Sequence, residues 1–197
     1  MTTTAILGLG NMGKGIARRL AGKGALVLGA RDTTEAAAFG ASIGASVLSY
    51  ADAAQAADIV VLALPYAAAL DVAALPELAG KIVVDISNPI TADFSGLSIG
   101  HSTSAAEEIQ KLAASSQVVK AFNTIFASLF DAPVAATAKV PVFLAGNDAA
   151  AVDAVATLVE TAGFAVEKAG GLDGARLLEP VGMLNIRFGY GLGRGTS

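Results

Sequence analysis

The feature that most constrains this chain is a glycine-rich run at residues 8–13, Gly-Leu-Gly-Asn-Met-Gly, which follows the apolar segment Thr4–Leu7. A pattern typical of a helix begins directly after the second glycine, at Asn11, and continues to Lys23. Glycines spaced G-x-G-x-x-G between a strand and a helix are typical of loops that bind the diphosphate of a dinucleotide. A glycine turn without a ligand is the alternative, and the flanking elements favour the binding loop.

Each glycine of this run has its own predicted role. Gly8 permits a tight turn, Gly10 lets the backbone approach the diphosphate, and Gly13 lets the helix lie close to the strand. The amides of Asn11 and Met12 then face an anion at the favourable end of the helix dipole. These five residues are the predicted diphosphate site.

Apolar runs and helical patterns alternate along the rest of the chain. The predicted strands are Thr4–Leu7, Ala25–Gly29, Ser46–Leu48, Ile59–Leu64, Lys81–Ile86, Val118–Phe122, Val140–Leu144 and Phe164–Lys168. The predicted helices are Asn11–Lys23, Thr33–Ile43, Tyr50–Ala57, Ala67–Ala73, Ala105–Ala114, Ala149–Ala162 and a last one at about 174–190. The alternation predicts an α/β fold with a doubly wound parallel sheet of Rossmann type. We expect one domain over residues 1–197 with a short C-terminal helix.

The end of the second predicted strand bears on which nucleotide is bound. An NAD-binding chain usually has a carboxylate there, whereas an NADP-binding chain has an Arg or a small polar group. Here Gly29 and Ala30 end the strand and Arg31 follows, which favours NADP because a guanidinium binds a phosphate with two hydrogen bonds. Asp32 leaves two interpretations open: it reaches a ribose, or it caps the next helix.

Three further strand ends carry candidate site residues, because all parallel strands end at one edge of the sheet. Leu64, Pro65 and Tyr66 follow the fourth strand and are expected along the ribose and nicotinamide. Asn88 follows the fifth strand, and Asn123 with Thr124 follows the sixth, where amides and hydroxyls can bind a carboxamide or a second ligand. A turn-forming role is the alternative for each of the polar residues.

Composition excludes several other classes. The chain has no cysteine and a net charge of −4, so we expect no disulfide, no thiolate metal site and no nucleic-acid partner. No apolar run reaches the length of a membrane span and no signal peptide is evident, so a cytoplasmic protein with no membrane partner is predicted.

No group has metal-ligand spacing, and His101, in a polar loop, is expected to be solvated. Asp85, inside a strand, is expected to accept a structural hydrogen bond. Such scarcity of acid–base groups suits hydride transfer between two small redox carriers.

Longer motifs resemble the NADP oxidoreductases that depend on the deazaflavin coenzyme F420, and similarly the cytosolic NADPH-oxidising domains of membrane ferric reductases. The matching motifs are Ile-Leu-Gly-Leu-Gly-Asn-Met-Gly-Lys-Gly at 6–15, Gly-Ala-Arg at 29–31, Leu-Ala-Leu-Pro-Tyr at 62–66, Val-Val-Lys-Ala-Phe-Asn-Thr-Ile at 118–125 and Leu-Glu-Pro-Val-Gly-Met-Leu-Asn-Ile-Arg-Phe at 178–188. The resemblance implies a homodimer that transfers hydride between NADPH and a deazaflavin lying over the nicotinamide. It further implies a 2′-phosphate contact from Arg31. The residues implied to line the pocket between the two rings are Asn88, Asn123, Thr124 and Ile125. The stretch 184–188 is implied to close this pocket or to form the dimer contact.

One position departs from the deazaflavin-using members, which have His where this chain has Asn123. FMN, FAD, a quinone or a metal chelate therefore remain open as acceptors. The glycine run also resembles that of the β-hydroxyacid dehydrogenases and imine reductases, whose large additional helical domain has no counterpart in these 197 residues. A small enzyme of that kind and a non-catalytic NADP(H) sensor are the alternative functions.

Overall fold

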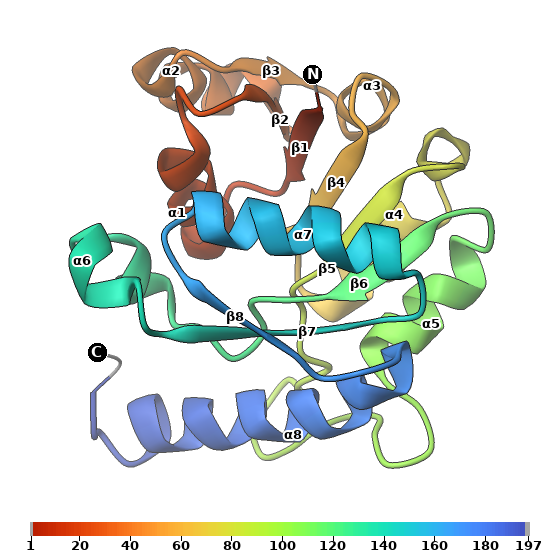
Figure 1. Ribbon diagram of the computed structural model, residues 1–197, viewed down its shortest axis with the longest axis vertical. Helices are drawn as coiled ribbons and strands as arrows, with labels where there is room; N and C mark the ends of the chain where they lie inside the picture. Colours follow the sequence, from red (N-terminus) through yellow and green to blue (C-terminus); the bar gives the residue numbers. More distant parts are fainter. Residues whose placement is uncertain (1, 196–197) are drawn as a thin grey trace.

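The computed structural model describes residues 2–195, in which eight strands form one sheet with helices on both faces (Figure 1). The strands are β1 (Thr3–Leu7), β2 (Ala25–Gly29), β3 (Ser46–Leu48), β4 (Ile59–Leu62), β5 (Ile82–Asp85), β6 (Gln117–Lys120), β7 (Pro141–Gly146) and β8 (Ala165–Lys168). The α-helices are α1 (Asn11–Leu20), α2 (Thr33–Ile43), α3 (Tyr50–Gln55), α4 (Tyr66–Ala73), α5 (Ala105–Leu112), α6 (Val134–Thr137), α7 (Ala149–Thr161) and α8 (Ala175–Ile186). Short 3₁₀ turns add η1 (Pro76–Leu78), η2 (Ala127–Phe130) and η3 (Leu172–Gly174).

The strand order is β3-β2-β1-β4-β5-β6-β7-β8, and the first six strands are parallel. The predicted α/β fold of Rossmann type is confirmed, because the first six strands of the sheet, β3-β2-β1-β4-β5-β6, follow the order of dinucleotide-binding sheets. The chain winds outward in one direction from β1 to β3 and in the other from β4 onward. The carboxyl ends of β1 and β4 therefore meet at a switch point, where folds of this kind bind their ligands.

The last two strands differ in direction from the rest. β7 pairs with β6 in an antiparallel manner, and β8 runs parallel to β7. The alternation of strands and helices predicts a wholly parallel sheet, but β6 is joined to β7 by a turn and the short helix α6 rather than by a covering helix. An antiparallel edge on a parallel sheet is common in doubly wound folds, so the fold class is unchanged.

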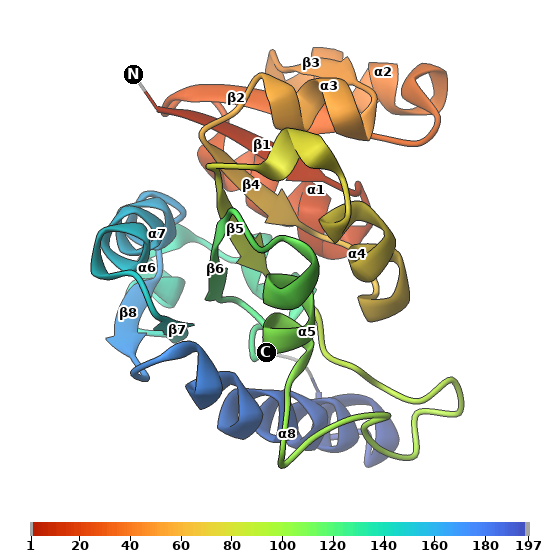
Figure 2. The ribbon, with the colours of Figure 1, turned by 90° about the vertical axis from the view of Figure 1, so that its right-hand side faces the viewer.

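Two apolar layers hold the helices on the sheet. One layer packs α1 and α7 against side chains such as Ile6 and Val61, and the other packs α3, α4 and α5 against side chains such as Leu7 and Leu62. Neighbouring residues of one strand thus face opposite layers, which is why the central strands are apolar throughout. Figure 2 shows α7 on one side of the sheet and α3, α4 and α5 on the other.

The predicted C-terminal helix is present as α8, and a single π-type turn (Arg187–Gly191) continues it. Figures 1 and 2 both show α8 at the end of the molecule opposite to β3 and α2, beside the long loop between β5 and α5. Pro180 lies inside α8, where its missing amide removes one hydrogen bond of the helix. Within residues 2–195, none of the helices has the length and apolar character that crossing a bilayer requires.

Candidate functional site

The glycine turn at the end of β1 has a geometry that only glycine fits at its first position. Gly8 has a φ of +98°, and a Cβ there would lie 2.5 Å from the carbonyl oxygen of Ala63. Its amide donates to the carbonyl oxygen of Gly29 at 3.0 Å, which ties the turn to β2. Gly8 thus permits the close approach of the chain segments that end β1, β2 and β4.

The other two glycines differ sharply in their surroundings. A Cβ on Gly13 would lie 1.9 Å from the carbonyl oxygen of Gly8, so any side chain would push α1 away from the turn. A Cβ on Gly10 would meet nothing within 4 Å. Gly13 is therefore needed for packing, whereas the space beside Gly10 is open for a ligand.

The start of α1 offers an anion-binding surface. Gly10 is the N-cap residue and no side chain caps the helix. Helical hydrogen bonding begins with the amide of Lys14, which donates to the carbonyl oxygen of Gly10 at 2.9 Å. The amides of Asn11, Met12 and Gly13 precede that bond and are left for a ligand. The first turn holds no acidic side chain, so nothing opposes an anion there.

Arg31 lies in a cavity of about 390 Å³ between the ends of β2 and β4. The residues that line it are Arg31, Tyr50, Ala51, Leu64, Pro65, Ala68, Asp71, Val72 and Leu75. We call this space the Arg31 cavity. The structure thus brings three sequence-predicted residues, Arg31, Leu64 and Pro65, together. Its walls are mostly apolar, with Asp71 as a carboxylate among them, and its exposed guanidinium suits a phosphate beside a flat base.

Asp32 caps α2. Its Oδ1 accepts hydrogen bonds from the amides of Thr34 and Glu35, both at 2.9 Å. Of the two interpretations left open by the sequence, the structure therefore supports the helix cap. The carboxylate that a chain specific for NAD would direct at the ribose is engaged with the backbone here. Among the residues that line the cavity, Arg31 is the cation and Asp71 is a carboxylate.

A second cavity, of about 270 Å³, lies at the ends of β5 and β6 beneath α8. It is lined by Asn11, Met12, Ile86, Asn88, Phe122, Asn123, Thr124, Ile125, Phe126, Ala127, Gly182, Asn185, Ile186 and Tyr190. We call this space the ring cavity. All four residues predicted to line a ring–ring pocket are on its wall, together with two residues of the glycine run. The diphosphate loop and the predicted ring pocket are therefore adjacent.

Two amides form a fixed pair in the ring cavity. The side chain of Asn88 donates to the carbonyl oxygen of Asn123 at 2.8 Å, and the side chain of Asn123 donates to Oδ1 of Asn88 at 2.9 Å. Asn123 also donates to the carbonyl oxygen of Leu178 in α8, at 2.8 Å. Gly182 makes room for the pair, since a Cβ there would lie 2.7 Å from the amide of Asn88. A glycine inside an apolar helix was the sequence signal for this close approach, which the sequence analysis missed.

The stretch 184–188 divides between two environments. Asn185 and Ile186 line the ring cavity, whereas Leu184 in α8 and Phe188 in the turn after it are exposed. Asn185 also donates to the carbonyl oxygen of Thr124 at 3.1 Å, so α8 is bonded directly to the chain that follows β6. The same stretch therefore forms part of the wall of the cavity and presents an apolar surface.

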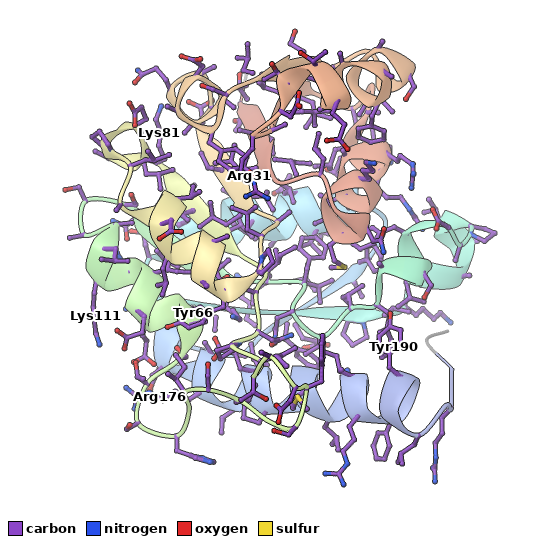
Figure 3. The ribbon with its side chains drawn as sticks, turned by 180° about the vertical axis from the view of Figure 1, so that it is seen from behind. Arg31, Tyr66, Lys81, Lys111, Arg176 and Tyr190 are labelled. Atoms are coloured by element: carbon purple, nitrogen blue, oxygen red, sulfur yellow. The ribbon has the colours of Figure 1, made fainter. Side chains whose placement is uncertain are left out.

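Tyr66 lies apart from both cavities. Figure 3 shows it on α4, pointing toward α5 and α8, well away from Arg31. Partial burial raises the pKa of its phenol, and the carboxylates of Glu108, Glu179 and Asp85 act in the same direction. Of the three residues Leu64, Pro65 and Tyr66, only the first two line the Arg31 cavity. His101 is likewise outside both cavities and exposed, as expected.

A buried ion cluster beside the ring cavity was not predicted. Nζ of Lys120 lies 2.7 Å from Oδ2 of Asp85, 2.7 Å from Oε1 of Glu179 and 2.5 Å from the carbonyl oxygen of Ser87, and all three charged side chains are buried. Asp85 and Lys120 are partners in the register of β5 and β6. The sequence did carry a signal, because a charged residue within a fully apolar strand needs a partner.

The carboxylate of Glu179 accepts hydrogen bonds from two elements, β6 and α5. Its Oε2 accepts a hydrogen bond from the amide of Ala105 at 3.0 Å, at the start of α5. Burial raises the pKa of Glu179, although Lys120 and the Ala105 amide act in the opposite direction. Oδ1 of Asp85 accepts from the amide of Ser87 at 2.8 Å, which is the structural hydrogen bond expected of this residue. The cluster thus joins β5, β6, α5 and α8 next to Asn88.

Within the part of the chain that the structure describes, no three histidine or carboxylate side chains gather in a way that would hold a metal ion. The wall of the ring cavity consists of amides, apolar groups, one threonine and one tyrosine. Its chemistry suits the binding of a planar polar ring.

Comparisons with known proteins agree with this geometry. The family model for "NADP oxidoreductase coenzyme F420-dependent" matches residues 3–89. The crystal structure of a protein assigned as an F420-dependent NADP reductase, from Arthrobacter sp. FB24, is 32% identical with a TM-score of 0.86, covering 100% of this chain and 96% of that one. A reductive aminase from Aspergillus terreus in complex with NADPH and ethyl-5-oxohexanoate shares the fold, at 20% identity and a TM-score of 0.73, over 98% of this chain and 63% of that one.

A curated relative is the metalloreductase STEAP3 of Rattus norvegicus, 31% identical over 180 residues. The match covers 89% of this chain and 35% of that protein, so the chain spans about a third of its length.

Proposed function

This chain belongs to the family of coenzyme F420-dependent NADP oxidoreductases, and from this premise we propose that it transfers a hydride between NADP(H) and a deazaflavin- or flavin-type acceptor. The observation that carries the proposal is the succession of three surfaces along one edge of the sheet. These are the Arg31 cavity, the free amides at the start of α1 and the ring cavity. A dinucleotide phosphate has its charged and aromatic parts in that same order.

The chain's own residues then have distinct roles toward the nucleotide. The amides of Asn11, Met12 and Gly13 bind the diphosphate, and Gly10 leaves room for it. Arg31 binds the 2′-phosphate with a charge-assisted hydrogen bond. When bound, NADPH supplies the hydride from its nicotinamide ring, which the ring cavity holds away from water.

The wall of the ring cavity favours hydride transfer between two redox carriers. Among the described residues that line it, none is a carboxylate, a histidine or a lysine. Reduction of a carbonyl usually needs an acid placed beside the substrate, whereas transfer between two ring systems needs alignment and exclusion of water. The Asn88–Asn123 pair and the apolar side chains around it meet the second requirement.

The acceptor has room next to the nicotinamide position. A further cavity of about 910 Å³ lies along the end of α8 and is lined by Phe94, Ser95, Met183, Ile186, Arg187, Tyr190, Gly191 and Leu192. It shares Ile186 and Tyr190 with the ring cavity, so the two are contiguous. Aromatic and aliphatic walls suit the flat face of a deazaflavin, FMN or FAD. Arg187 supplies a positive charge for an anionic tail.

A screen of acceptors under anaerobic conditions tests the proposal. NADPH oxidation is followed by absorbance with F420, FMN, FAD and a ferric chelate, and we expect saturable turnover with at least one of the first three. Tight NADPH binding without turnover of any acceptor would instead indicate a nucleotide sensor. A titration that shows no NADPH binding at millimolar concentration would overturn the proposal entirely.

Tyr190 supports a second candidate function. Its phenol lines the ring cavity and is the one lining group that can donate a proton to a small carbonyl or imine. Turnover of a hydroxyacid or an imine with NADP(H), abolished in Tyr190→Phe, would favour a small dehydrogenase or imine reductase. We rank this candidate second because Tyr190 is 66% exposed and is therefore poorly protected from water.

We also propose that the chain acts as a homodimer in the cytoplasm. Four exposed apolar side chains of α8 and the turn after it are spaced as one helical stripe: Leu177, Val181, Leu184 and Phe188. A second copy of this chain would cover that stripe, which water otherwise contacts.

The proposed cytoplasmic location is in line with the absence of cysteine, since disulfides are typical of oxidising compartments. Cell fractionation tests the location.

A further inference from the structure

Asn123 carries a buried hydrogen-bond acceptor that the protein leaves unused. The residue follows β6, is 6% exposed and lies on the wall of the ring cavity. Its Oδ1 is buried and has no hydrogen-bond partner among the described residues. Buried polar atoms are nearly always paired, so an unpaired one beside a cavity points to a ligand.

The orientation of this amide is fixed by two backbone carbonyls. Nδ2 of Asn123 faces the carbonyl oxygen of Leu178 at 2.8 Å, and only a donor can do so. Nδ2 of Asn88 faces the carbonyl oxygen of Asn123, which leaves Oδ1 of Asn88 as the second acceptor for Nδ2 of Asn123. A flipped Asn123 would bring two oxygens together at hydrogen-bond distance. Oδ1 of Asn123 must therefore be the atom without a partner.

The surrounding backbone keeps Asn123 in this position despite its own strain. Phe122, directly before it, has a φ of +56°, a left-handed conformation that costs energy for an aromatic residue. Its ring packs against Phe130 and Phe164, with ring centres 6.0 and 6.2 Å away. Such strain is found where the surrounding structure determines one conformation, as in ligand sites.

The position of Asn123 selects the part of the ligand that it faces. In sheets of this order the nicotinamide lies at the carboxyl ends of β4 to β6, across the switch point from the adenine. Asn11 and Met12, whose amides bind the diphosphate in the proposed function, line the same cavity. The nicotinamide has one neutral hydrogen-bond donor, the NH₂ of its carboxamide. This step rests on the proposed NADP(H) binding.

We infer that Oδ1 of Asn123 accepts a hydrogen bond from the carboxamide NH₂ of the nicotinamide. Asn88 and the Leu178 carbonyl then act as positioning groups, because they hold the Asn123 amide in the orientation that presents oxygen to the ligand. The bond fixes the rotation of the nicotinamide ring and thereby the ring face that the acceptor meets.

The 3-acetylpyridine analogue of NADPH provides the test, because a methyl group replaces the carboxamide NH₂. Dissociation constants are measured by fluorescence titration for NADPH and for the analogue. We expect the wild-type chain to bind the analogue about tenfold more weakly, the equivalent of about 1.4 kcal/mol. In Asn123→Leu the ratio of the two constants should fall to about one, since no acceptor is left to satisfy.

Asn185→Leu is the matched control, because it makes the same substitution on the wall of the same cavity. Its ratio should stay at about tenfold. A wild-type ratio of one, or a tenfold ratio kept in Asn123→Leu, would overturn the inference while leaving NADPH binding intact. Failure of both nucleotides to bind would overturn the proposed function as well. The wild-type ratio needs no variant to fold.

A flavin methylated at N3 checks the competing assignment. Methylation removes the imide N–H, which is the donor that the acceptor molecule would offer. If Asn123→Leu changes the preference for FMN over N3-methyl-FMN and leaves the nucleotide ratio unchanged, the oxygen serves the acceptor and the inference is wrong. We expect the flavin preference to be the same in wild type and variant.

Discussion

Gly10 and Gly13 stand three residues apart, and the structure gives them opposite surroundings. A Cβ on Gly13 would collide with the Gly8 carbonyl oxygen at 1.9 Å, whereas a Cβ on Gly10 would enter open space. Only Gly13 is therefore required by the fold itself. Gly10 is required by whatever approaches the start of α1.

Alanine at each of these two positions should separate stability from binding. Gly13→Ala should lower the free energy of unfolding by about 1–3 kcal/mol, because α1 or the turn must move. Gly10→Ala should cost less than about 1 kcal/mol of stability. Its NADPH affinity should nevertheless fall about tenfold or more, the equivalent of about 1.4 kcal/mol. Urea unfolding and fluorescence titration measure the two quantities, and an unchanged affinity in Gly10→Ala would contradict the loop's proposed role.

Arg31 should discriminate between the two nucleotides. Arg31→Ala should weaken NADPH binding by about 1.5–3 kcal/mol, because a charge-assisted hydrogen bond to the 2′-phosphate is lost. NADH, which lacks this phosphate, should bind almost unchanged. Titration of both nucleotides measures the effect, with Arg18→Ala as the control because Arg18 pairs with Asp131 outside both cavities. Equal losses for NADPH and NADH would remove Arg31 from the phosphate site.

At the scale of elements, the buried cluster of Asp85, Lys120 and Glu179 joins four of them. Lys120→Met should lower the free energy of unfolding by about 3–5 kcal/mol, because two buried carboxylates lose their cation. Lys168→Met is the matched control, since Lys168 forms an exposed pair with Asp153 and such pairs contribute about 0–1 kcal/mol. Urea unfolding compares the two, and equal losses would show that the cluster adds nothing beyond a surface pair.

Glu179 should give the stability of the protein a pH dependence of definite sign. Burial raises the pKa of this carboxyl above its ordinary value of 4.5. At a pH between the pKa of the unfolded chain and that of the folded chain, the folded chain holds a proton that the unfolded chain has released. The stability that this proton contributes is therefore present below pH 4.5 and is lost as the pH rises through the folded pKa. Wild type should therefore lose stability relative to Glu179→Gln on going upward from about pH 4 to about pH 8. Urea unfolding across this range measures the difference, and parallel curves would contradict it.

Much of this element structure could be predicted from the sequence. The strands that become β1, β2 and β3 agree with their predicted ranges within a residue, because each is an apolar run bounded by turn residues. The short helix α6 and the turns η1 and η2 were missed, since three or four residues carry no readable period. The predicted strand Ile59–Leu64 ends two residues early, at Leu62, because an apolar run does not reveal where pairing stops.

The candidate site was predictable where strand ends alone decide it. Arg31 and Asn123 follow strands of a parallel sheet, so their edge of the sheet follows from the order of elements. The outward turn of Tyr66 and the partnership of Lys120 with Glu179 depend on how α4 and α8 pack, across 59 residues in the second case. Local pattern carries no information on such pairs.

At the scale of the whole molecule, the apolar stripe of α8 should decide the oligomeric state. Leu177 and Leu184 are 74% and 48% exposed, and we expect a second copy of the chain to cover them. The double substitution Leu177→Glu and Leu184→Glu should convert a homodimer to a monomer, because four buried carboxylates per dimer would be without partners. Sedimentation measures the mass, with Leu112→Glu on α5 as the control at another exposed leucine. A monomeric wild type would contradict the proposed dimer.

The direction of β7 is a property of the whole molecule that the apolar pattern of the strand does not reveal. A strand has the same apolar pattern whichever way it runs, and only the connection before it differs. Here the link from β6 to β7 holds no helix long enough to cross a face of the sheet, so β7 returns beside β6 in the antiparallel sense.

The Arg31 cavity and the ring cavity have no lining residue in common. Each is built from different strand ends, and the glycine turn lies between them. Under the proposed function, nucleotide preference and electron acceptor would therefore depend on separate sets of residues. Exchanging the residues around the Arg31 cavity to recruit NADH would then leave the molecule bound at the ring cavity unaffected.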